Sequence, residues 1–116
     1  MKKLFVSIAI AALCSTAEAG FLNGNNYRAL GDSQRLGYVE GMIDGMLSAG
    51  AMAHTKLARA DQLNLCLGNM HADAIQARAI VDRYINANPA YWGDDMANLV
   101  WPAMQGACRA TGSSLD

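Results

Sequence analysis

The sequence contains few of the residues from which catalytic and metal sites are usually built. Its 116 residues include 2 histidines, 3 cysteines and 2 prolines, and only 16% of them are charged. The sequence shows no Ser-His-Asp, Cys-His or metal-ligand constellation, so it supports neither an enzyme nor a bound metal or cofactor. His54 and His71 are far apart, and a lone histidine is more often a surface or cap residue than a ligand.

The sequence also lacks a basic block and, after its first residues, a long apolar run. Nine lysines and arginines stand against ten aspartates and glutamates, which gives a formal net charge of −1. This balance disfavours nucleic-acid binding, which requires clustered positive charge. Beyond residue 20 no stretch reaches the roughly 18 apolar residues of a membrane-spanning helix, so we expect no membrane span there.

The first nineteen residues have the pattern of a secretory signal peptide. Lys2 and Lys3 precede an apolar run, residues 4–13, and Ala17-Glu18-Ala19 has the small-residue pattern of a cleavage site. We therefore expect cleavage after Ala19, export to the periplasm, and a single domain over residues 20–116.

Cysteine usage predicts one disulfide in this exported domain. Cys14 lies in the signal peptide, and Leu13 before it disfavours a lipoprotein anchor because a small residue is expected there. Cys66 and Cys108 remain, and an even number of cysteines in a small exported domain is typical of a disulfide. The two cysteines form no CxxC motif, which disfavours a metal site.

Residues 32–56 predict a long central helix with one smooth side. Five small residues lie four apart and so form one ridge on a helix: Gly37, Gly41, Gly45, Ala49 and Ala53. Each glycine costs a helix interior about 1 kcal/mol relative to alanine. We therefore predict that another backbone packs closely on Gly37, Gly41 and Gly45, either from this chain or from a second copy in a homodimer.

Further helices are expected on both sides of the central one. A short helix within residues 21–30 should end at Gly31 in the left-handed conformation that glycine tolerates. Gly68-Asn69 marks a turn, and a helix should run from about Ala72 to Asn88-Pro89. The last helix is expected over residues 96–107, and Pro102 should kink or divide it. Residues 111–116 form a polar tail that we expect to be frayed. These elements predict an all-α fold, a small bundle of about four helices around the glycine- and alanine-rich helix.

Two groups of side chains are candidate functional residues. Glu40 and Asp44 lie four apart on the central helix, where they would form an acid pair, a cation site or, more simply, part of the solvated face. A third alternative is that one carboxylate, Asp44, caps a helix or pairs within the fold. Residues 90–95 form a loop with two aromatic residues and two acids: Tyr91, Trp92, Asp94 and Asp95. Such a loop can anchor a partner, or Trp92 can pin the loop to the core.

Several motifs in order resemble the Rap/Tai-type immunity family of type VI secretion systems. They are Gly24-Asn25, Gly37-Tyr38-Val39-Glu40-Gly41 with Asp44 after it, Cys66-Leu67-Gly68, residues 83–89, and an alanine-rich helix that ends in Cys108. The resemblance implies a small helical periplasmic protein, often dimeric, that binds a cell-wall amidase toxin and blocks its active site. Many relatives carry a second cysteine pair, whose places here are Gly31 and Arg35, and proline is frequent where Gly68 stands.

Two functions therefore remain open from the sequence. The first is a periplasmic immunity protein that inhibits a peptidoglycan amidase, and the second is a small acid-response chaperone, which is also helical with one disulfide. If the protein acts by inserting an element into a partner's cleft, a loop on a rigid scaffold is the expected element. We predict residues 90–95 for this role, with residues 54–62, which include Lys56 and Arg59, as the alternative.

Overall fold

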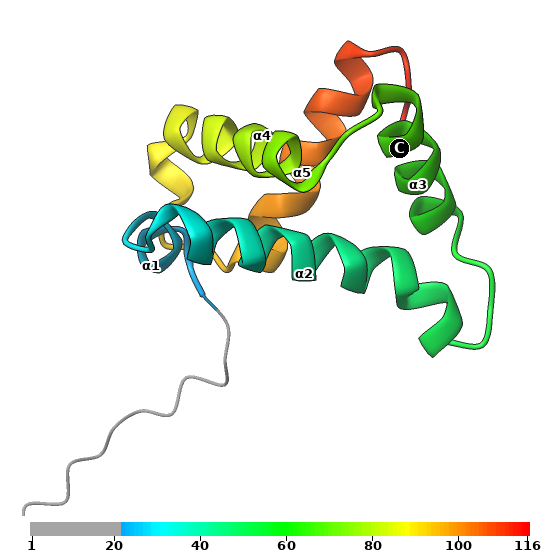
Figure 1. The fold of residues 1–116 in the computed structure, drawn as a ribbon, viewed down its shortest axis with the longest axis horizontal. Helices are drawn as coiled ribbons and strands as arrows, with labels where there is room; N and C mark the ends of the chain where they lie inside the picture. Colours follow the sequence, from blue (N-terminus) through cyan, green and yellow to red (C-terminus); the bar gives the residue numbers. More distant parts are fainter. Residues whose placement is uncertain (1–21) are drawn as a thin grey trace, which may run out of the picture.

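The structure, a computed structural model, describes residues 22–116, and this part of the chain is helical (Figure 1). In chain order its helices are α1 (Gly24–Arg28), α2 (Asp32–Met52), α3 (Ala58–Met70), α4 (Ala74–Ala87), the 3-10 turn η1 (Pro89–Tyr91) and α5 (Met96–Ala110). The predicted small all-α bundle is confirmed. The predicted signal peptide, residues 1–19, lies outside the described residues.

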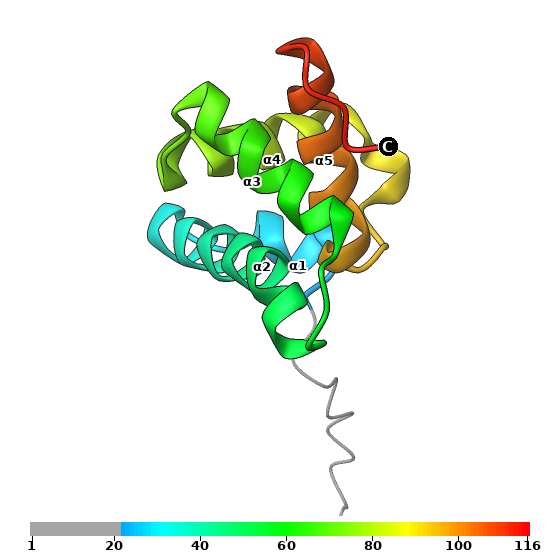
Figure 2. The same cartoon turned by 90° about the vertical axis from the view of Figure 1, so that its right-hand side faces the viewer.

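The helices are arranged around a contact between α2, α4 and α5. In Figure 1, α4 lies above α2, α5 passes behind both, and α3 stands at the far end of α2 at a steep angle to it. Figure 2 looks from the side of α3 and shows it in front of α5, which it contacts. Within residues 22–116, no helix combines the length and the apolar character that crossing a membrane requires.

Most of the core is built from apolar residues at helical spacing on three helices. α4 contributes Ala77, Val81 and Ile85, which lie four apart on one stripe. α2 contributes two fully packed residues, Val39 and Ile43. α5 contributes the largest set: Met96, Leu99, Val100, Ala103, Met104 and Cys108. The helix that holds the core together is therefore α5, while much of the glycine-rich α2 faces outward.

Two of the predicted helix ends differ from those in the structure. Gly31 is extended, with φ −69° and ψ 165°, so its predicted left-handed conformation is wrong. It is the N-cap of α2, and its N–H donates to the side chain of Gln34 at 3.1 Å. The turn predicted at Gly68-Asn69 is also wrong, because α3 continues to Met70 and ends at His71, which has φ 49°. His71 is thus a helix cap.

The last helix and the tail also correct the sequence-based expectations. The sequence predicts that Pro102 kinks or divides the last helix, and α5 is one helix across Pro102, so the division is wrong. A proline at this position deprives the carbonyl of Asn98 of its helical partner, but Asn98 is exposed and water can take that place. The tail is not frayed: Leu115 is 1% exposed and belongs to the core. Its burial could not be seen in a polar sequence with one leucine.

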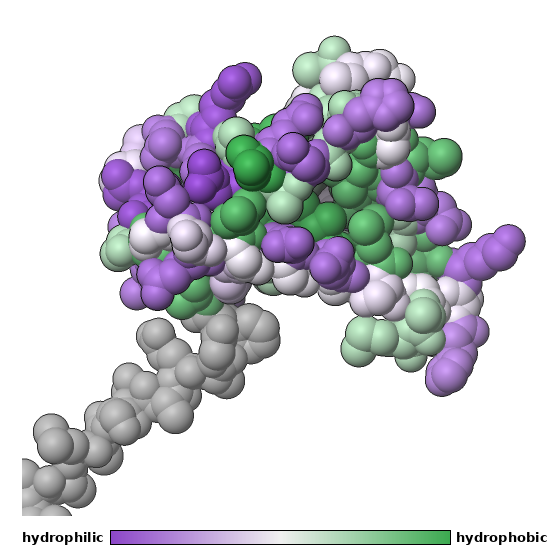
Figure 3. Space-filling view, viewed as in Figure 1, coloured by the Kyte–Doolittle hydropathy of each residue, from purple (hydrophilic) through white to green (hydrophobic). Residues whose placement is uncertain are grey.

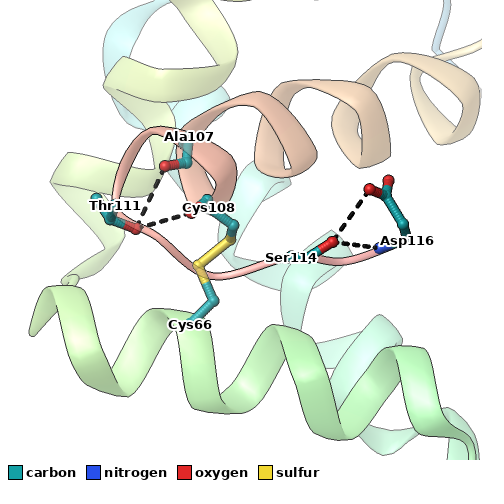
Figure 4. Close-up of a disulfide and its surroundings, with 6 residues drawn as sticks. All are labelled: Cys66, Ala107, Cys108, Thr111, Ser114 and Asp116. Atoms are coloured by element: carbon teal, nitrogen blue, oxygen red, sulfur yellow. Dashed lines mark hydrogen bonds between the residues drawn. A yellow bond between two sulfur atoms is a disulfide. The ribbon is translucent and has the colours of Figure 1, made fainter.

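The predicted disulfide between Cys66 and Cys108 is confirmed, and it joins the middle of α3 to the end of α5 (Figure 4). The two Cα atoms lie 5.8 Å apart, and both cysteines are fully buried. The tail passes the disulfide, where the N–H of Ser113 donates to the carbonyl of Cys108 at 2.8 Å. One covalent bond therefore holds α3, α5 and the return of the tail in one place.

A polar cluster ties α1, α2 and α4 together at the opposite end of the fold. The hydroxyl of the buried Tyr27 donates to Asp82 at 2.8 Å. The other oxygen of Asp82 lies 3.5 Å from Arg35 and 3.8 Å from Arg78. Arg35 also pairs with Asp32. Both Asp32–Arg35 and Arg78–Asp82 have the spacing of helical ion pairs, which is the sequence signal for this cluster.

Tyr27 predicts that stability falls at alkaline pH. Burial, and then the hydrogen bond to Asp82, raise the pKa of Tyr27 well above its ordinary value of 10.0. Above pH 10 the unfolded chain therefore loses this proton while the folded chain keeps it, so the free energy of unfolding should fall by up to about 1.4 kcal/mol per pH unit. Urea unfolding measured from about pH 9 to about pH 12 checks this. The free energy of unfolding of Tyr27→Phe should fall less steeply with pH than that of the wild type. An unchanged slope would contradict the assignment.

Candidate functional site

The loop from Pro89 to Asp95 is fixed to the N-terminal segment by backbone hydrogen bonds. The N–H of Asn25 donates to the carbonyl of Trp92 at 2.8 Å, and the N–H of Gly24 donates to that of Asp94 at 3.1 Å. At the start of α5, the N–H of Met96 donates to the carbonyl of Leu22 at 2.8 Å. These bonds cross a long separation in sequence, so the loop is a rigid part of the fold.

Trp92 anchors this loop. Its ring nitrogen donates to the carbonyl of Ile85 at 2.7 Å, and the ring is partly buried against the core. The guanidinium of Arg28 stacks on the outer side, 3.3 Å from the ring centroid. A Cβ atom on Gly24 would lie 2.9 Å from the Trp92 carbonyl, so α1 approaches the loop as closely as glycine allows. Of the two roles weighed for Trp92, the anchoring role is the one that these contacts describe.

The other candidate residues of the loop are presented to solvent. The side chain of Tyr91 is 50% exposed, and Asp94 and Asp95 are exposed as well. Burial and, to a lesser extent, the charge of Asp95 raise the pKa of Tyr38, which lies beside the loop. The loop thus offers one aromatic ring and two carboxylates on a fixed backbone, and Arg28 adds one cation at its edge.

The glycine ridge of α2 does not pack on another part of the described chain. A Cβ atom added at Gly37, Gly41 or Gly45 would meet nothing within 4 Å, and all three residues are exposed. The prediction that another element of this chain covers the ridge is therefore wrong for residues 22–116. The reason is that α2 turns its other side, with Val39 and Ile43, toward the core. A second copy as the covering element stays a prediction.

The alternative loop between α2 and α3 is more open. Residues 51–59 are all exposed, and Met52 is 78% exposed. Lys56 lies in this segment, and Arg59 in the first turn of α3 has its guanidinium 5.8 Å from the ring centroid of Trp101. The segment is basic and apolar, whereas the loop before α5 is aromatic and acidic.

Glu40 and Asp44 lie at the edge of a cavity of about 410 Å³ between α2, α3 and α4. Both side chains are exposed, as expected for a solvated helix face, but they also line this cavity. The other residues that line it are Ile43, Leu47, Asn64, Leu67, Gly68, His71, Ala72, Asp73, Ala74 and Ala77. The sequence could not predict the cavity, because its walls come from three helices and one turn.

The candidate side chains in the described residues are better placed for contacts with a partner than for binding a metal ion. Among residues 22–116, no group of three or more histidine, cysteine, aspartate and glutamate side chains is placed to hold a metal ion. Sequence reasoning missed Arg28 and Asp73, which only the fold brings to the loop and to the cavity respectively.

No protein-family model, curated protein or solved structure matches the chain. The resemblance to Rap/Tai-type immunity proteins therefore remains a hypothesis based on the motifs.

The open space above the ridge predicts that Gly41→Ala stabilises the protein. Alanine removes the helix penalty of glycine without a clash, so the free energy of unfolding should rise by about 0.5–1 kcal/mol. Gly24→Ala is the matched control and should destabilise, because its Cβ would press on the Trp92 carbonyl. Thermal unfolding at several protein concentrations checks both. A loss of stability in Gly41→Ala that grows with concentration would show that a second copy covers the ridge.

The anchoring role of Trp92 predicts a loss of stability in Trp92→Phe. Phenylalanine keeps most of the ring but cannot donate to the Ile85 carbonyl, so we expect a cost of about 0.5–1.5 kcal/mol. Tyr91→Phe removes a polar group from the exposed neighbour and should stay within about 0.5 kcal/mol of the wild type. Denaturant melts compare the two variants, and equal stabilities would show that the indole hydrogen bond does not hold the loop.

Proposed function

We propose that this chain is an exported protein-binding module, an immunity-type protein that inhibits a peptidoglycan amidase in the periplasm. The observation that carries the proposal is the rigid loop before α5, which presents Tyr91, Asp94 and Asp95 to solvent. Its backbone is fixed by hydrogen bonds to the segment around α1. A loop held in this way loses little conformational entropy when it binds.

The chemistry of the loop supports recognition of a cleft with a basic rim. An exposed tyrosine supplies a large contact area at low entropic cost, and interface energy is concentrated in such aromatic residues. Carboxylates at positions 94 and 95 would pair with basic groups at the rim and fix the orientation. In the proposed complex, Tyr91 enters the amidase cleft while Trp92 keeps the loop in shape from inside.

Export is supported by the disulfide and by the signal-like residues 1–19. Disulfides form and persist in oxidising compartments, and the periplasm is one of them. The proposed working form is therefore the disulfide-bonded chain from about residue 20 onward. No catalytic residue and no cofactor enter this proposal, because inhibition by occlusion needs neither.

A pull-down from periplasm tests the proposal, with the disulfide-bonded protein as bait and cell-wall amidases as the expected catch. Tyr91→Ala should then weaken binding of the captured amidase by about 10-fold or more, and Asp94→Asn by less. Asp61→Asn, an exposed acid on α3, is the control with the same change of charge.

Three outcomes would contradict parts of the proposal. Capture of many unrelated proteins at acid pH alone would favour the chaperone function. Absence of any amidase in the catch would remove the immunity function. Full binding by Tyr91→Ala and Asp94→Asn would move the contact away from this loop, and the segment around Lys56 and Arg59 would become the candidate.

A further inference from the structure

A cavity lies between α2, α3 and α4, and no residue of the loop before α5 lines it. Ile43 and Leu47 of α2, Leu67 of α3 and Ala77 of α4 give it apolar walls. In Figure 3, apolar side chains gather at the centre of this face between the three helices, with polar ones around them. Its volume of about 410 Å³ lies in the range of pockets that hold a side chain or a small ligand.

Three carboxylates line this cavity, together with one imidazole, that of His71. Glu40 and Asp44 come from α2, and Asp73 comes from the turn before α4. Asp73 is held in position, because its carboxylate accepts the N–H of Gln76 at 2.7 Å as the N-cap of α4. No lysine or arginine of residues 22–116 lines the cavity. Apolar walls under three carboxylates complement a cation that is carried on an apolar chain.

The surface beside the cavity distinguishes a polypeptide from a free small molecule. Gly68 of α3 lines the cavity, is exposed, and leaves open space where a side chain would stand. A polypeptide backbone can therefore approach α3 closely at this point while one of its side chains enters the cavity.

We propose that this face docks a basic segment of a protein partner, with an arginine or lysine side chain in the cavity. The methylene groups of that side chain lie against Ile43, Leu47 and Leu67, and its cation faces Glu40, Asp44 and Asp73. The proposal adds a second contact surface to a protein-binding module. It rests on the proposed function only in that the bound partner is a protein, and it is tested independently of the loop before α5.

NMR titration of the disulfide-bonded protein with a blocked peptide, Gly-Leu-Arg-Leu-Gly, tests this site. We expect saturable shifts of the amides of Leu67, Gly68 and Ala77. The same peptide with citrulline, the neutral isostere of arginine, should bind about 10-fold more weakly, and a glutamate version should not bind. Added salt should weaken the arginine peptide, because the carboxylates are exposed.

Two double variants with the same change of charge show which carboxylates act. Glu40→Gln with Asp44→Asn should weaken the arginine peptide about fivefold, the effect of removing two partly exposed ion pairs. Asp61→Asn with Asp116→Asn removes two exposed acids outside both the cavity lining and the loop before α5, and should leave binding unchanged. Equal weakening by both double variants would show a general charge effect and overturn the proposal.

Other outcomes also decide the question. No saturable shift at peptide concentrations of about 10 mM, or equal binding of the citrulline peptide, would overturn the site. Binding of free arginine as tightly as the peptide would assign the cavity to a small cation and overturn the protein partner. Shifts confined to residues 91–95 would place the contact on the loop, which would overturn this proposal and leave the proposed function standing.

Discussion

The position of α3 depends on one covalent constraint, the disulfide between Cys66 and Cys108. α3 contributes only two residues to the buried core, Leu63 and Cys66 itself. Leu67 and Met70 of α3 are only partly buried against the core. Full burial of one leucine is worth about 1.5–3 kcal/mol, which is little against the entropy of ordering a whole helix. Closing a loop with a sequence separation of 42 residues contributes about 4 kcal/mol in the chain-entropy model. The disulfide therefore supplies stabilisation that the small buried apolar area of α3 does not provide.

This constraint acts on only one of the two proposed recognition surfaces. The loop before α5 is shaped by hydrogen bonds to the N-terminal segment and by Trp92, near the Tyr27–Asp82 cluster. The cavity has α3 as one of its walls, so its shape depends on the bond between Cys66 and Cys108. An oxidising compartment would keep the cavity formed, whereas the loop would hold its shape in either redox state.

The sequence predicted those features that depend on local pattern or on composition. Helical spacing located α2, α4 and α5 within a few residues, and the cysteine count predicted the disulfide. The errors arose where tertiary contacts decide: Gly31 serves as an N-cap, α3 runs through Gly68, and Leu115 folds back into the core. Of the candidate site, the exposed acids and aromatics of the loop were predictable. The cavity was not, since Glu40, Leu67 and Asp73 meet only in the folded chain.

Hydrogen exchange measured with and without the disulfide tests most directly whether this bond holds α3. In the oxidised protein, the amides around Leu63 in α3 and around Val81 in α4 should both be protected. After reduction, we expect protection to fall across residues 58–70 while α4 and the Tyr27–Asp82 cluster keep theirs. Unchanged protection of α3 in the reduced protein would contradict this account, and so would a simultaneous loss across all helices.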